Sequence, residues 1–189
     1  MVYNGFVVLE KIREVNGVKY SGVENAPFPL SDKEIETFFS PKQINQFEDL
    51  TIFPEDGVSL LNLELVQPYI AYCHEMRYNY RLLYCEICEN VRPIDLELRK
   101  KFAKEESFLG YDVGQCCFDF YSCLLTDIIY RPALFNNRHN KKLNPNGLFA
   151  NIEDAIIFLN ERRALIKQHP SQFEKGNMRV IALYSVEKM

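Results

Sequence analysis

Two tyrosines and three acidic residues gather in one short segment and are the strongest candidates for recognition chemistry. They are Tyr111, Asp112, Asp119, Tyr121 and Asp127. Tyrosine offers a large contact area together with a hydroxyl group, and carboxylates attract a basic partner. One interpretation is therefore an acidic, tyrosine-rich surface that binds another protein. The other is that these carboxylates are merely solvent-exposed residues and helix caps.

Six cysteines are the candidate nucleophiles and metal ligands. Cys85 and Cys88 form a Cys-x-x-Cys pair, but a structural zinc site needs a second pair at compatible spacing. Cys73 and His74 are adjacent, and neighbours on a helix point about 100° apart. The sequence therefore predicts no metal, no cofactor and no catalytic residue. An enzyme that uses a cysteine or a carboxylate stays open as the alternative.

A basic, asparagine-rich stretch over residues 131–147 could hold a phosphate group. Aromatic residues for base stacking are sparse there, so we expect no nucleic-acid partner. Asparagine favours turns, and the same stretch suits a solvated loop in which His139 is exposed. His169, which precedes a proline, is also expected at the surface.

Short patterns in the N-terminal third predict the first elements. Asn16-Gly17 between two apolar runs predicts a β-hairpin over residues 5–23. Capping boxes predict two short helices, one beginning after Ser31 and the other after Ser40. A turn is expected over residues 54–58.

The rest of the chain predicts an irregular alternation of strands and helices. Residues 61–65 suit a strand or a helix, and Pro68 is expected to open a helix. The later predicted elements are a strand over 80–89, a helix over 95–104, a strand over 107–113, a helix over 118–130, a helix capped by Asn151 and a strand over 178–186. Together they predict a single α+β domain over residues 1–189, with helices covering a mixed or antiparallel sheet. Residues 1–58 could form a subregion of it.

Composition excludes several classes of protein. Of the 189 residues, 47% are hydrophobic and 25% are charged, which rules out a disordered or low-complexity chain. No apolar run approaches the roughly 18 residues of a membrane helix, and the N-terminus lacks a basic signal region. We therefore expect a cytoplasmic protein with no membrane partner. The first 130 residues are acidic overall and the last 59 are basic, which suits an acidic face for a basic partner.

Short segments of the last eighty residues or so resemble those of bacterial immunity proteins from polymorphic or contact-dependent toxin systems. The segments are Phe108-Leu109-Gly110-Tyr111-Asp112-Val113, then Asp119-Phe120-Tyr121-Ser122-Cys123-Leu124-Leu125, then Leu143-Asn144-Pro145-Asn146-Gly147-Leu148-Phe149, which leads into residues 152–163 and the last strand. Cys116 and Cys117 have no counterpart in this pattern.

The resemblance implies a non-enzymatic protein that binds a cognate toxin domain and blocks or distorts its active site. Many such toxins are nucleases with basic faces, which the acidic first two thirds of the chain would suit. A phage or mobile-element interaction protein is the further alternative.

Overall fold

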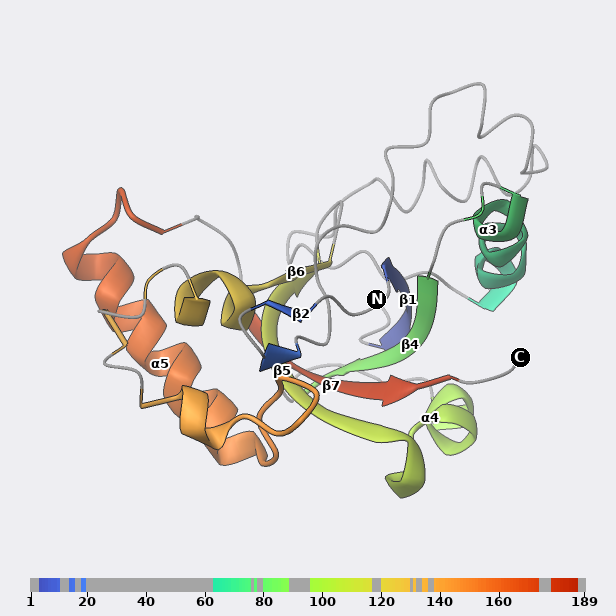
Figure 1. Cartoon of the computed structure of the whole chain (residues 1–189). Coiled ribbons are helices and arrows are strands. Elements are labelled where there is room, and N and C mark those ends of the chain that lie inside the picture. Colours follow the sequence, from blue (N-terminus) through green and yellow to red (C-terminus); the bar gives the residue numbers. More distant parts are fainter. Residues whose placement is uncertain are drawn as a thin grey trace.

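The computed structural model describes residues 4–10, 14–15, 18–19, 63–75, 77, 80–88, 96–116, 120–129, 131, 134–135, 138–173 and 178–186 (Figure 1). The helices predicted after Ser31 and Ser40 and the turn over 54–58 lie outside these residues. A five-stranded sheet forms the centre, with strand order β1-β4-β7-β5-β6. Its strands are β1 (Asn4–Glu10), β4 (Tyr80–Ile87), β5 (Phe108–Cys116), β6 (Phe120–Ser122) and β7 (Arg179–Ser185).

Every strand pair in this sheet is antiparallel, and helices pack beside it. The helices are α3 (Leu63–Glu75), α4 (Leu96–Phe102) and α5 (Ile152–Gln168), with short helical turns η1 (Glu105–Ser107), η2 (Leu124–Ile129) and η3 (Asn140–Lys142). Figure 1 shows α5 along one side of the sheet and α3 beside β1 and β4, and α4 contacts β1. The predicted α+β class is confirmed, and the sheet is antiparallel. Among the described helices, none combines the length and the apolar character needed to cross a membrane.

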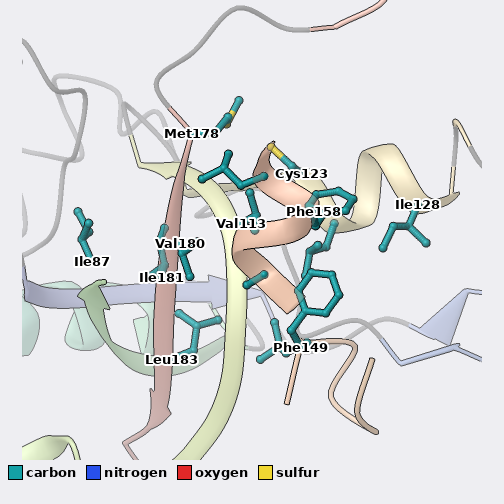
Figure 2. Close-up of a cluster of buried hydrophobic side chains, with 14 of the residues drawn as sticks. Ile87, Val113, Cys123, Ile128, Phe149, Phe158, Met178, Val180, Ile181 and Leu183 are labelled. Carbon is teal, nitrogen blue, oxygen red and sulfur yellow. The ribbon is translucent and has the colours of Figure 1, made fainter. Parts of the chain in front are cut away.

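The core lies where the central strands meet α5. Residues 180–183 of β7 are all buried, as expected for a strand that is covered on both faces. Helix α5 begins where the Asn151 side chain accepts a hydrogen bond of 2.9 Å from the Asp154 backbone, as predicted. Its residues Ala155, Phe158 and Leu159 are buried at helical spacing. Figure 2 shows Phe158 among apolar side chains of the strands.

The predicted hairpin over residues 5–23 is only partly correct. A two-stranded sheet of β2 (Glu14–Val15) and β3 (Val18–Lys19) flanks the Asn-Gly pair. The apolar run before it belongs instead to β1, which pairs with β4 and places Phe6 opposite Tyr84. In this position the ring centroids of Phe6 and Phe102 are 4.9 Å apart, and Phe6 is buried. The Asn-Gly pair therefore lies between two paired strands as predicted, whereas the apolar run pairs with β4, where it buries aromatic surface.

Two helix predictions need correction. The helix expected over residues 118–130 is wrong in its first part, because residues 120–122 form β6 and pair with β5. Only the second part is helical, as the π-type turn η2. Pro68 does not open a helix, because α3 begins at Leu63 and contains the proline. Val66, in the turn before the proline, is fully buried, and this packing offsets the backbone hydrogen bond that proline removes.

Candidate functional site

The structure places the five predicted recognition residues in different environments. Asp112 on β5 is fully buried, and its Oδ1 accepts hydrogen bonds from the Ser122 hydroxyl at 2.8 Å and the Val113 backbone at 2.7 Å. Tyr121 lies on β6, opposite Gln115, but its side chain is outside the described set, as is all of Asp119. Tyr111 is partly exposed. The expectation that Asp112 lies on the surface is therefore wrong, because its carboxylate joins two strands.

Asp127 is also fully buried, so neither surface exposure nor a helix-capping role describes it. Arg162 of α5 donates from Nε to Asp127 Oδ2 at 2.6 Å, and Arg131 pairs with the other carboxylate oxygen. The guanidinium groups of Arg131 and Arg162 also lie over the Phe173 ring, at 5.0 Å and 5.4 Å from its centroid respectively. Asp127 therefore anchors α5 to η2. The four-residue spacing between Asp127 and Arg131 was the sequence signal for this pair.

Ion pairs connect the basic stretch over residues 131–147 to α5. Arg138 pairs with Glu161 of α5 at 2.7 Å, and Lys142 pairs with Asp154. His139 is not exposed as predicted: its Nε2 lies 2.7 Å from the Glu161 carboxylate, and its ring is buried. Its ring contacts those of Phe135, Phe149 and Phe158. Arg138, His139 and Lys142 therefore face carboxylates of α5, whereas Lys141 is exposed.

A row of four aromatic side chains crosses one face of the sheet and forms the candidate site. We call it the tyrosine row, and its members are Tyr84, Tyr184, Phe108 and Tyr111. Consecutive ring centroids are 5.9, 5.3 and 5.0 Å apart. Tyr84 is fully buried, whereas the other three are partly exposed. The row therefore runs from the core to the surface.

A β-bulge in β5 explains how two of these rings reach the same face. The register with β7 places Phe108 opposite Tyr184 and Tyr111 opposite Ala182, with a shift between Phe108 and Gly110. Side chains alternate along a regular strand, so residues 108 and 111 would otherwise point to opposite faces. The extra residue of the bulge brings both rings to the same side.

The bulge is supported by a loop from another part of the chain. Gly110 has φ +139°, and a Cβ there would lie 2.7 Å from the Leu148 Cβ. The Asn144 amide donates to the Leu109 carbonyl at 2.7 Å, and Tyr111 exchanges two backbone hydrogen bonds with Phe149. Two of the segments that carry the resemblance, residues 108–113 and 143–149, thus meet in space and position Tyr111.

Glu86 lies beside the tyrosine row, next but one to Tyr84 on β4. Its side chain is 7% exposed, and the Tyr84 hydroxyl donates to its Oε1 at 3.3 Å. Arg99 of α4 approaches the same oxygen with Nε at 3.4 Å. Burial raises the pKa of Glu86, and the opposing effects of Arg99 and Tyr84 are smaller.

The pKa values of two phenols in the row are raised in the same way. Burial, together with the charge of Glu86, raises the pKa of Tyr184 to about 12. Burial also raises the pKa of Tyr111, with further contributions from Cys88, Glu153 and Glu86. Both phenols therefore keep their protons at physiological pH and can donate hydrogen bonds to a ligand.

The sequence analysis missed Glu86 and most of the row. The signal was present in the predicted strand over 80–89, where Tyr84, Glu86 and Cys88 alternate with apolar residues and so share one face. Cys88 is partly exposed, and its thiol donates to the Glu86 carbonyl at 3.7 Å. Within the described ranges, no three His, Cys, Asp or Glu side chains are placed to hold a metal ion.

Comparisons with known proteins add no assignment. No protein-family model matches the chain, and neither the curated proteins nor the solved structures gave a match.

Proposed function

We propose that this chain is a non-enzymatic binding protein of the immunity type, which binds and neutralises a cognate bacterial toxin domain in the cytoplasm. The observation that carries the proposal is the tyrosine row, whose outer three rings are partly exposed over a sheet face. Tyrosine is enriched among the residues that dominate binding energy at protein interfaces. Tyr111, a candidate from the sequence, belongs to this row.

Charges near the row favour a basic partner. Glu105 and Glu106 of η1 lie three and two residues before Phe108 and are exposed, and Glu153 acts electrostatically on Tyr111. Acidic side chains around a contact surface speed the association of a basic partner. A toxin domain with a basic surface, such as a nuclease, fits this arrangement.

Co-expression with the product of the adjacent upstream gene tests the proposal. We expect that product to be toxic alone, to be harmless beside this chain and to co-purify with it. Tyr111→Ala should weaken the complex by roughly tenfold or more, because truncating a central interface aromatic costs over 1 kcal/mol. Ile156→Ala is the control, since Ile156 is an exposed apolar residue on α5.

Two outcomes would contradict the proposal. A neighbour that is harmless alone, or that forms no complex, would remove the toxin assignment. A complex that tolerates Tyr111→Ala as well as Ile156→Ala would remove the tyrosine row from the interface. Thermal unfolding of both variants checks that each is folded.

One observation favours a second candidate, an enzyme with a carboxylate or cysteine active site. Glu86 is a buried carboxyl with a raised pKa, and Cys88 lies on the same sheet face. Perturbed ionisable groups often mark active sites. The reactivity of Cys88, considered in the Discussion, separates this candidate from a binding protein.

A further inference from the structure

Glu86 is a buried carboxylate whose charge is incompletely compensated. Its contacts with Tyr84 at 3.3 Å and Arg99 at 3.4 Å are both longer than the roughly 2.7–2.9 Å of a charge-assisted hydrogen bond. Both contacts involve Oε1, and no donor from the described part of the chain forms a hydrogen bond with Oε2. A carboxylate that is almost removed from water gains strongly from a closer cationic partner.

Arg99 shows which chemical group can reach this carboxylate. Its side chain comes from α4 and is 53% exposed, so a guanidinium group approaches Glu86 from the solvent side. The Nε contact is long, at 3.4 Å, and the Arg99 side chain is largely in water, so little holds this guanidinium group in place. The position that Arg99 occupies is therefore open to exchange with an equivalent group.

The aromatic rings beside Glu86 suit a planar cation. Glu86 of β4 and Tyr111 of β5 both lie opposite Ala182 of β7, and Tyr184 is two residues further along the same face of β7. A guanidinium group can stack on a tyrosine ring while it donates two parallel hydrogen bonds to a carboxylate. An ammonium group offers no such planar fork.

We infer that Glu86 is the recognition site for an arginine side chain of the protein partner, whose guanidinium group displaces Arg99 and stacks beside the tyrosine row. This inference rests on the proposed function, because it names the chemistry by which the partner is recognised. The partner's arginine would use both carboxylate oxygens, whereas Arg99 reaches only Oε1. Charge complementarity at a buried site then adds specificity to the apolar contact of the row.

The test uses the full chain and a small probe, so it needs no toxin. N-acetyl-arginine methylamide is titrated into the protein while the backbone amide signals of Glu86 and Tyr184 are followed by NMR. We expect saturable binding, with a dissociation constant on the order of millimolar. Arg99→Ala should bind the probe about tenfold more tightly, because its competitor is gone. Lys100→Ala is the matched control, since Lys100 contacts Glu97 and not Glu86.

Glu86→Gln in the Arg99→Ala background should lose at least tenfold in affinity for the probe, as expected for a lost charged hydrogen bond. The uncharged citrulline analogue and the lysine analogue should bind more weakly than the arginine probe. Equal binding of the three probes, or an Arg99→Ala variant that binds no more tightly than Lys100→Ala, would overturn the inference. The comparison of Arg99→Ala with Lys100→Ala remains decisive even if Glu86→Gln misfolds.

The two proposals fail in different ways. A missing complex with the upstream gene product would count against the toxin partner but would leave the probe titration unchanged. A stable complex whose affinity does not change with Glu86→Gln would count against the arginine site alone.

Discussion

Two buried carboxylates of this protein differ in how their charge is compensated. Asp127 lies between two guanidinium groups and accepts a hydrogen bond of 2.6 Å from Arg162. Glu86 has the longer contact of 3.4 Å with the exposed Arg99. Tight pairing makes a carboxylate a structural anchor, whereas loose pairing leaves it able to take another cation. The same side-chain chemistry therefore serves stability in one place and recognition in the other.

Removing the Asp127 charge should destabilise the protein severely. Asp127→Asn leaves Arg162, which is 1% exposed, without its ionic partner. Breaking a buried pair in this way costs about 3–5 kcal/mol. Urea unfolding measures the loss, and Glu97→Gln is the control because the pair of Glu97 and Lys100 is exposed. Unfolding of Asp127→Asn at the same urea concentration as the control would contradict the anchoring role.

Glu86→Gln should stabilise the protein, in contrast to Asp127→Asn, and this gain in stability should depend on pH. Burial raises the pKa of Glu86 above its ordinary value of 4.5, so the folded state disfavours the charged form. The wild-type protein therefore loses stability as pH rises from below 4.5 through the raised pKa, whereas the glutamine variant does not. Thermal unfolding at pH 4 and pH 7 measures this difference. We expect the stability of the variant relative to that of the wild type to rise from pH 4 to pH 7. An unchanged difference in stability would mean that Glu86 titrates normally.

At the scale of elements, the β5 bulge is the device that builds the tyrosine row. It depends on a loop, residues 143–149, that is distant in sequence and forms backbone hydrogen bonds with Tyr111. The bulge and the loop form one unit, since Gly110 leaves room for Leu148 and Phe149, and Phe149 is hydrogen-bonded to Tyr111. A change that disturbs the bulge should therefore affect recognition as well as stability.

Gly110→Ala tests this coupling. A Cβ at this position would lie 2.7 Å from the Leu148 Cβ and 2.9 Å from the Phe149 carbonyl oxygen. Overpacking, together with the φ of +139°, should cost about 2–4 kcal/mol. Denaturant unfolding gives the loss, and NMR of the Tyr111 amide shows whether the strand moves. A variant with wild-type stability and an unmoved Tyr111 signal would show that the glycine is not required.

At the scale of the whole molecule, the reactivity of the cysteines separates a binding protein from an enzyme. Cys85 and Cys123 are buried, whereas Cys88 is partly exposed beside the tyrosine row. A thiol reagent followed by peptide mapping should modify Cys88 faster than Cys85 and Cys123. The bound partner should protect it, because the row is covered in the complex.

The absolute rate of Cys88 modification distinguishes a binding protein from an enzyme. Modification of Cys88 at a rate typical of an exposed, unactivated thiol fits a binding protein. A much faster rate at neutral pH would indicate an activated thiolate and would favour the enzyme. A partner that leaves the Cys88 rate unchanged would place the interface elsewhere.

Local signals predicted much of the fold correctly. The strands over 80–89, 107–113 and 178–186, the helix over 95–104 and the Asn151 cap all depend on neighbouring residues. The error over residues 118–130 arose because β6 obtains its hydrogen bonds from β5, not from its own neighbours. The surface position expected for His139 failed for a similar reason, since its burial depends on α5. The single-domain organisation stays a prediction.

The sequence by itself determined most of the element types, the α+β class and Tyr111 as a candidate, because period, caps and turn residues act over a few positions. Only the tertiary structure decided which charges are buried and which aromatic rings share a face. Asp112 and Asp127 became internal anchors, and Glu86 came to lie beside Tyr184, nearly a hundred residues away in sequence. The register of antiparallel strands and the bulge at Gly110 bring these groups together, and both depend on contacts between distant segments.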